Sequence, residues 1–188
     1  MKMRNSIYII IISFGIWVLT IGLSESNQVR IPHSKIKKSV KKYLKIQNFS
    51  LLSIEDNDET FSQSKIFEIK TDTVIVGYVY VSRVNSCRAG GCSITPSDNA
   101  IEFEYFDYYF ITDTHANVVN VKVFNYQATH GHQIMSRGWL KQFVGYGGNQ
   151  SLLYGKDIQA ISGATISAKT LIDDIQKAEL VILDIINN

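Results

Sequence analysis

The chain has 188 residues, a formal net charge of +2 and only two cysteines. This length allows one domain of ordinary size with an N-terminal extension, and the small net charge provides no electrostatic footprint for nucleic acid, so no nucleic-acid partner is expected. The chain has ten tyrosines and nine phenylalanines. Such residues are more often part of a β-sheet than of a ligand-binding site.

Residues 1–24 differ in composition from the rest of the chain. Lys2 and Arg4 precede an uncharged run, Ser6–Ser24, which is about as long as the roughly 20 residues of a bilayer-spanning helix. The run is either an uncleaved anchor or the apolar part of a cleaved signal peptide, with Gly22-Leu23-Ser24 as the nearest cleavage site. Both alternatives export the remaining chain. We expect a single anchor in the cell membrane, with the domain on the periplasmic or extracellular side.

Residues 25–72 are expected to hold a basic helix and connecting strands. Apolar residues recur at helical spacing through a block without acids, which predicts an amphipathic helix with one basic face. Its cations are Arg30, Lys35, Lys37, Lys38, Lys41, Lys42 and Lys45. The face is either simply solvated, or rests on anionic lipid or an acidic partner. Two apolar runs, Phe49–Ile54 and Ile66–Ile69, predict strands around the polar stretch Glu55–Gln63.

Residues 73–188 are expected to form the main domain. Thr73–Val84 is dense in valine and tyrosine, which predicts a strand covered on both faces. Ile101–Thr112 and Val118–Phe124 predict an antiparallel hairpin around the turn Asp113–Asn117. The expected fold class is therefore α+β, a mainly antiparallel sheet with packed helices, preceded by one N-terminal transmembrane or signal helix.

Two helices are expected after the hairpin. One runs from His132 to about Val144, where a glycine cluster ends it, and the last runs from about Ser167 to Ile186. The last helix should bury a stripe made of Leu171, Ile175, Ala178, Ile182 and Ile186. Its charged residues should lie mostly off this stripe; they are Asp173, Asp174, Lys177 and Glu179.

Small residues surround one hydroxyl just before the last helix, in Gln159–Ser167. Gly163 and Ala164 leave little side chain beside Thr165, so a bulky anion could approach the main chain there. The helix that follows would offer free N–H groups and the positive end of its dipole. The alternative is an ordinary turn in which Thr165 caps the helix.

The sequence Ser-Gly-Ala-Thr-x-Ser, residues 162–167, resembles the attachment motif of the FMN-binding domain family. That family includes the C subunit of sodium-translocating NADH:quinone reductases and the G subunit of Rnf electron-transport complexes. The resemblance implies that Thr165 carries FMN through a phosphoester bond made by a separate flavin transferase. The other cofactor-binding residues are Ser162, Gly163, Ala164 and Ser167, with the two serines as hydroxyl neighbours of the phosphate.

The resemblance covers about Thr73 to Leu183, and only the segment around Thr165 is specific. The family usually has an aspartate six residues before the modified threonine, where this chain has Gln159, with Asp157 two residues further upstream. In the loop before the helix expected from His132, Ala128 and His130 stand where the family usually has a glutamate and a proline. Candidates to flank the flavin ring are Trp139, Phe143 and Tyr146.

These observations predict a membrane-attached electron-transfer protein that carries FMN covalently. No nicotinamide fingerprint and no catalytic-triad order is visible in the sequence, so the electron donor and acceptor are expected to be redox partner proteins or a quinone. The alternative is a flavin-free, membrane-anchored binding module that keeps the FMN-binding fold.

Cys87 and Cys92 bracket Arg-Ala-Gly-Gly after a predicted strand. In an exported chain, a small structural disulfide that stiffens the turn is the leading interpretation. A redox-active pair and a zinc site completed by His130 and His132 are the alternatives. No metal is expected.

Overall fold

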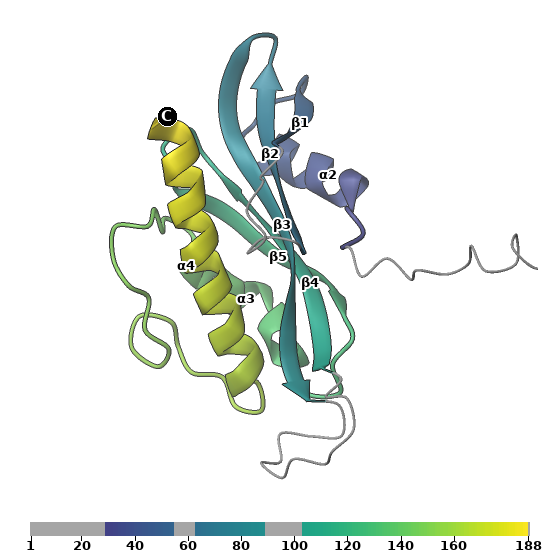
Figure 1. Cartoon of the computed structure of the whole chain (residues 1–188), viewed down its shortest axis with the longest axis vertical. Helices are drawn as coiled ribbons and strands as arrows, with labels where there is room; N and C mark the ends of the chain where they lie inside the picture. Colours follow the sequence, from purple (N-terminus) through teal and green to yellow (C-terminus); the bar gives the residue numbers. More distant parts are fainter. Residues whose placement is uncertain (1–28, 55–62, 89–102, 188) are drawn as a thin grey trace, which may run out of the picture.

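Five strands form one antiparallel sheet, and each strand pairs with its neighbour in the sequence (Figure 1). This computed structural model describes residues 29–54, 63–88 and 103–187. The strands are β1 (Ser50–Ile54), β2 (Ser64–Thr71), β3 (Val74–Arg88), β4 (Phe103–Thr112) and β5 (Val118–Tyr126). The α+β class and the β4–β5 hairpin are confirmed. β1 and β2, from the expected segment 25–72, belong to the same sheet as β3, from the expected main domain 73–188. The sheet therefore includes residues from both segments.

Alternating side chains give the sheet two buried faces. In β3, Tyr78 and Tyr80 belong to one apolar core, whereas Val79 and Val81 belong to a second core on the opposite face. All four side chains are buried. The prediction that this strand is covered on both faces is therefore confirmed.

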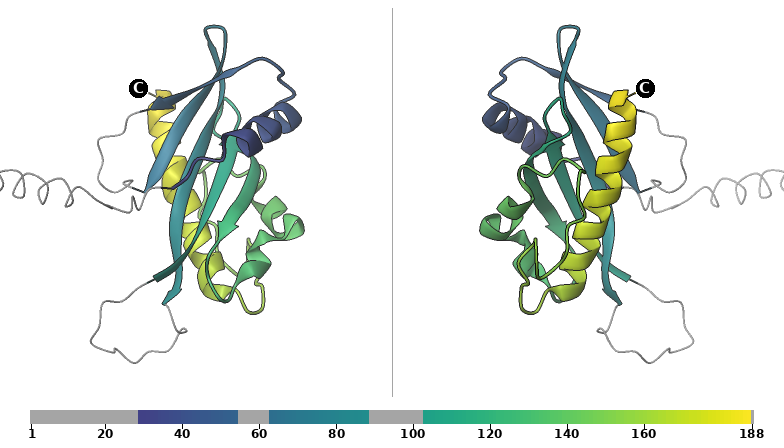
Figure 2. Two further views of the ribbon diagram at one scale, coloured as in Figure 1. Left: turned by 90° about the vertical axis from the view of Figure 1, so that its right-hand side faces the viewer. Right: turned by 90° about the vertical axis from the view of Figure 1, so that its left-hand side faces the viewer.

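Two helices cover these faces (Figure 2). α4 (Thr165–Asn187) packs over the first core and α2 (His33–Tyr43) over the second. α2 buries Ile36 and Val40, and the Ser39 hydroxyl lies 2.7 Å from the hydroxyl of Tyr109 in the sheet. The predicted amphipathic basic helix is thus present, with a narrow apolar stripe.

A half-buried carboxylate joins α4 to the middle of the sheet. Asp174 accepts hydrogen bonds from the Tyr108 hydroxyl (2.7 Å) and the Tyr80 hydroxyl (3.3 Å). Burial raises the pKa of Asp174, and burial together with the nearby carboxylate raises the pKa of both phenols. The phenols therefore stay protonated as donors, which fixes α4 in position along the sheet.

The prediction that Glu179 lies off the buried stripe is wrong. Its side chain is 0% exposed, and neither carboxylate oxygen has a hydrogen-bond partner among the described residues. Gly148 passes so close that a Cβ on it would lie 3.2 Å from Glu179 Cγ. Burial, followed by the negative charge of Asp113, raises the pKa of Glu179 to about 8. Asp173 and Lys177 are exposed, as expected.

The single helix predicted from His132 to Val144 is three short pieces. They are η2 (His132–Met135), α3 (Arg137–Leu140) and η3 (Lys141–Phe143). Ser136 adopts an extended conformation, with φ −60° and ψ 125°, between the first two pieces. Serine competes well for such non-helical positions, and Gly138 weakens the next turn, so helical periodicity alone overstated the length.

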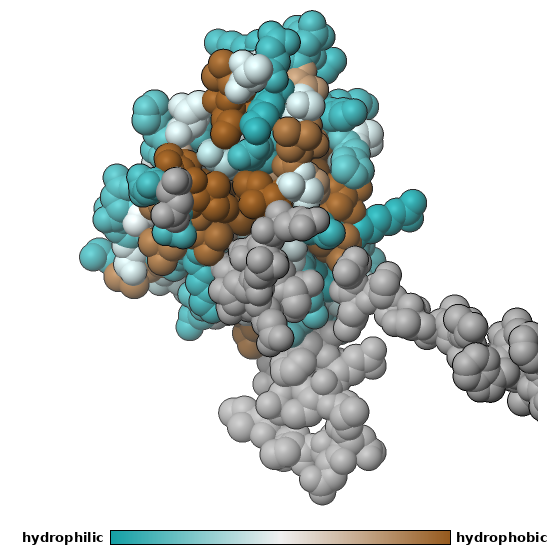
Figure 3. Space-filling view, turned by 45° about the horizontal axis from the view of Figure 1, so that its top comes forward, coloured by the Kyte–Doolittle hydropathy of each residue, from teal (hydrophilic) through white to brown (hydrophobic). Residues whose placement is uncertain are grey.

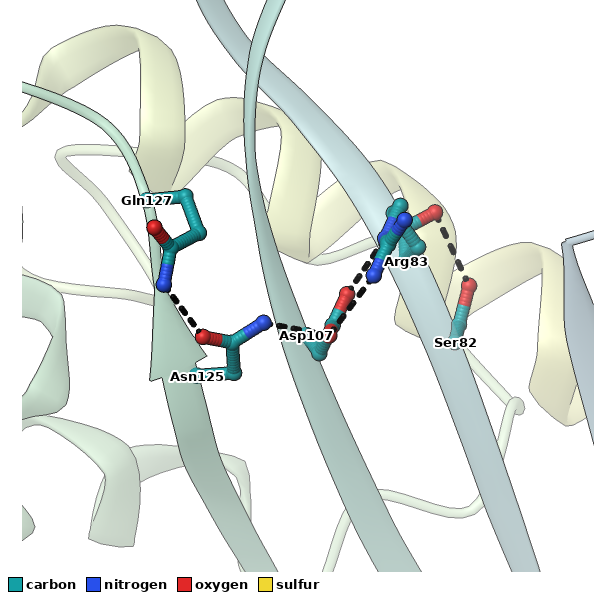
Figure 4. A network of polar contacts seen from close by, with 5 residues as sticks. All are labelled: Ser82, Arg83, Asp107, Asn125 and Gln127. Carbon is teal, nitrogen blue, oxygen red and sulfur yellow. Dashed lines mark hydrogen bonds and ion pairs between the residues drawn. The ribbon is translucent and has the colours of Figure 1, made fainter. Parts of the chain in front are cut away.

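A polar network crosses β3, β4 and β5 (Figure 4). Arg83 donates from Nε to Asp107 Oδ1 (2.7 Å) and from a terminal nitrogen to Asp107 Oδ2 (3.1 Å). Asn125 donates to the same carboxylate (2.7 Å), and Gln127 donates to Asn125 (2.6 Å). Asp107 is 1% exposed, so this paired charge fixes the register of three strands.

Apolar side chains reach the surface at the end of the molecule that carries the C-terminus (Figure 3). Leu180 in α4 is 60% exposed and Val74 at the start of β3 is 61% exposed. Partly buried neighbours, such as Ile75 and Leu183, pack against the first core. This core is therefore continuous with exposed apolar surface here.

None of the helices within the described residues qualifies as a membrane-spanning segment. The predicted anchor or leader, residues 1–24, lies outside the described residues, and so does Cys92. The anchor and the pairing of Cys87 with Cys92 stay predictions.

Candidate functional site

The turn before α4 places an alanine at the helix N-cap. The N–H of Ala168 donates to the carbonyl of Ala164 (2.9 Å), so Ala164 is the N-cap and Thr165 is the first helical residue. Alanine has no side-chain oxygen to accept from the first N–H groups of a helix, unlike the serine, threonine or aspartate preferred there. Among the described residues no side chain caps these N–H groups, which makes them available to a ligand. The alternative in which Thr165 caps the helix does not hold.

Gly163 sets the path of the chain into Thr165. Its φ of +75° lies in the left-handed region, and a Cβ there would be 3.2 Å from Gln133 Nε2. Ser162, Gly163 and Thr165 are exposed, whereas Ala164 is buried in the first core. The turn therefore presents the Thr165 hydroxyl to solvent at the N-terminus of α4, with little side chain around it.

Tyr154 supports this turn from the segment upstream. Its hydroxyl accepts from the N–H of Ile161 (3.1 Å) and lies 3.5 Å from Thr165 Oγ1. Lys169, one helical turn after Thr165, places its ammonium 5.9 Å from the centre of the Tyr154 ring. The Tyr154 hydroxyl thus lies next to the Thr165 hydroxyl, and Lys169 provides a cation near the Tyr154 ring. Neither was predicted, although the four-residue spacing of Lys169 from Thr165 on a helix was a usable signal.

Ser167 faces the interior and not the turn surface. It is 2% exposed, and its Oγ lies 2.7 Å from Ser86 Oγ and 2.9 Å from the Tyr126 hydroxyl. Tyr126 also donates to the carbonyl of His130 (2.6 Å). Ser167 therefore joins α4 to β3 and β5, which differs from its predicted role as a phosphate neighbour.

Gly131 allows the segment after β5 to approach α4. Its φ is +97°, and a Cβ would lie 2.5 Å from both Ser167 Oγ and the Tyr126 hydroxyl. With Gln133 beside Gly163, this brings residues 130–133 alongside the turn. His130 and His132 are exposed in this segment. Sequence periodicity did not indicate the contact, because it depends on a close approach that only glycine permits.

The three aromatic residues predicted to flank a flavin ring are core residues instead. Trp139, Phe143 and Tyr146 are buried in the first core, and the Trp139 and Phe143 rings meet edge to face at 5.4 Å. Trp139 Nε1 donates to the carbonyl of Gln159 (2.7 Å). Trp139 therefore positions the segment that leads into the turn and offers no open ring face.

Gln159 is held by its backbone. Besides accepting from Trp139, it donates its N–H to Gln142 Oε1 (2.8 Å), and the residue is exposed. Asp157, the nearest upstream carboxylate, accepts from the N–H of Leu153 (2.9 Å) and closes its own turn. The structure therefore gives Gln159 a fixed backbone and a side chain facing solvent, at the position where the family pattern has aspartate.

The turn offers several groups that could hold a phosphate. They are the first N–H groups of α4, which no described side chain caps, the exposed Thr165 hydroxyl, the small Gly163 beside it and the Lys169 cation one helical turn later. No protein-family model matches the chain, and no curated protein matches it either. The chemistry of the site is thus inferred from its geometry and from the resemblance of residues 162–167.

Proposed function

We propose that Thr165 carries FMN through a phosphoester bond and that the chain is a membrane-attached electron-transfer protein. The observation that carries this proposal is the exposed Thr165 hydroxyl at the N-terminus of a 23-residue helix with an alanine N-cap. A phosphate on Thr165 Oγ1 would lie at the positive end of the helix dipole, beside N–H groups that no side chain in the described part of the chain caps.

The surroundings of Thr165 support attachment by a second protein. To form the ester, Thr165 Oγ1 bonds to the flavin-side phosphorus of a flavin dinucleotide, the P–O–P bond breaks, the nucleoside monophosphate leaves, and the hydroxyl proton passes to a base. Among the described residues, the Tyr154 hydroxyl is the one hydrogen-bond partner of Thr165 Oγ1, at 3.5 Å, and no carboxylate or imidazole is hydrogen-bonded to it. The base that removes the proton is therefore assigned to the flavin transferase.

The neighbours of Thr165 have separate roles in this proposal. Gly163 lets the phosphate approach the main chain, Lys169 offers a compensating charge, and Tyr154 is the nearest ring for a flat ligand. Ser162, exposed just before Gly163, is the remaining hydroxyl neighbour. Ser167 keeps α4 in register with the sheet, so that the attachment point has a fixed position.

A covalent tether fits an exported carrier. FMN supplies transfer of one or two electrons when bound, and attachment makes its local concentration independent of the surrounding medium. A single tethered FMN needs a separate electron donor and a separate electron acceptor. We assign these roles to redox partner proteins or a quinone.

In-gel fluorescence tests the proposal. The chain is produced with an active flavin transferase, denatured and separated, so that only covalent flavin gives a signal. We expect fluorescence from the wild type and from Ser162→Ala, and none from Thr165→Val. A colourless wild type beside a modified control substrate would favour the flavin-free binding module. A signal that survives in Thr165→Val would move the attachment site.

A further inference from the structure

α2 presents a basic face to solvent that nothing in the described structure neutralises. Its buried residues are Ile36, Ser39 and Val40, and the opposite side of the helix faces solvent. Exposed cations occupy that side and its flanks: Arg30, Lys35, Lys37, Lys38, Lys41, Lys42 and Lys45. In the described residues the ion pairs are Lys70 with Glu68 and Arg83 with Asp107, and neither involves α2.

Repulsion between these positive charges destabilises α2. Lysines three and four positions apart, such as Lys38 with Lys41 and Lys42, repel one another across the helix surface. No acid occurs between Glu25 and Glu55 to offset them. Lys35 and Lys42 contact the rings of Phe124 and Tyr43 at 5.8 and 5.0 Å, which are weak contacts for a cation in water. An external surface with many negative charges would relieve this repulsion.

The chain itself brings α2 close to one such surface. Val29 is buried in the second core, so only residues 25–28 separate a fixed point of the domain from the uncharged run that ends at Ser24. An extended chain from Ser24 to Val29 spans at most about 18 Å. This reach is about twice the screening length at physiological ionic strength, roughly 8 Å. With the run in a bilayer, α2 stays near the headgroups, at high local concentration.

We propose that the basic face of α2 docks on the anionic headgroups of a lipid bilayer. The lysine stems and the half-exposed Tyr43 suit an interface that is apolar below and charged above. Since α2 and α4 cover opposite faces of the sheet, the sheet then lies between the bilayer and α4 (Figure 2). This docking does not depend on FMN.

Lysine footprinting of the full chain tests the docking. The chain is reconstituted in nanodiscs of phosphatidylcholine, with or without phosphatidylglycerol, and each lysine is acetylated under limiting reagent and measured by mass spectrometry. Each lysine near an anionic surface should raise the equilibrium constant for docking about fivefold. Four lysines together should therefore hold α2 almost completely in the docked state. We expect Lys37, Lys38, Lys41 and Lys42 to react roughly tenfold more slowly in anionic discs. Exposed Lys156 should be unaffected.

Two further arms make the result decisive. Screening in about 1 M salt should restore the rates, because the screening length falls to about 3 Å. Replacing the four lysines together by glutamine should remove the protection of Lys45, while the circular dichroism of the chain stays unchanged. Equal rates in both kinds of nanodisc would overturn the proposal. Protection by soluble polyglutamate alone would assign the face to an acidic protein instead.

Discussion

Replacing Glu179 by glutamine should change how stability depends on pH. Glu179 is fully buried, its two oxygens have no partner in the described residues, and burial raises its pKa from 4.5 to about 8. Between these values the folded chain keeps the proton while the unfolded chain releases it. Wild-type stability therefore falls as pH rises through this window and levels off above the folded pKa.

The magnitude follows from the two pKa values. Each pH unit inside the window costs the wild type about 1.4 kcal/mol, so the whole window from 4.5 to about 8 amounts to about 5 kcal/mol. That is comparable to the total stability of many domains. Glutamine resembles the protonated acid in shape and does not ionise, so the variant lacks this loss.

Chemical denaturation of both proteins across this pH range measures the effect. The other titrating groups are shared, so they cancel in the difference between the two free energies of unfolding. We expect the difference to be pH-independent below 4.5 and to grow in favour of Glu179→Gln up to about pH 8. A difference that stays constant through the window would show that Glu179 is solvated or paired in the folded state.

Two further substitutions test the packing around the site and the sheet. Gly131→Ala should destabilise the chain by about 3 kcal/mol, because its Cβ would lie 2.5 Å from Ser167 Oγ at a φ of +97°. In the control Gly138→Ala the nearest atom is 3.8 Å away, so the free energy of unfolding should change by less than about 1 kcal/mol. Arg83→Met should cost about 3 kcal/mol because it leaves the buried Asp107 without its cation, whereas Lys70→Met should cost about 0.5 kcal/mol. Urea denaturation measures both pairs, and equal losses within either pair would contradict the reasoning.

The sheet and the last helix could be predicted because their signals are local. Valine, isoleucine and tyrosine alternate or run continuously in β3 and β4, and apolar residues recur every three or four positions from Leu171 to Ile182. Both patterns depend only on residues close together in the sequence, so they indicate a strand or a helix whatever the element packs against. The observed start of α4 at Thr165 lies two residues before the expected one.

The features that could not be predicted depend on which segments meet in space. Glu179 is buried because the segment around Gly148 lies over it, and no periodicity in α4 indicates that cover. The inward direction of Ser167 follows from Ser86, 81 positions earlier in the chain. Tyr154 reaches the turn because the chain folds back between it and Ile161, seven positions later, and the Trp139 indole N–H bonds to the Gln159 carbonyl, 20 positions later.

Peptide mapping of the mature chain shows whether Thr165 carries a covalent flavin. Trypsin cleavage after Lys156 and Lys169 releases one peptide that contains Ser162, Thr165 and Ser167. After co-expression with an active flavin transferase, we expect this peptide to carry the mass of FMN less one water, with fragment ions that assign it to Thr165. An unmodified peptide, beside a control substrate that has been modified, would contradict the account.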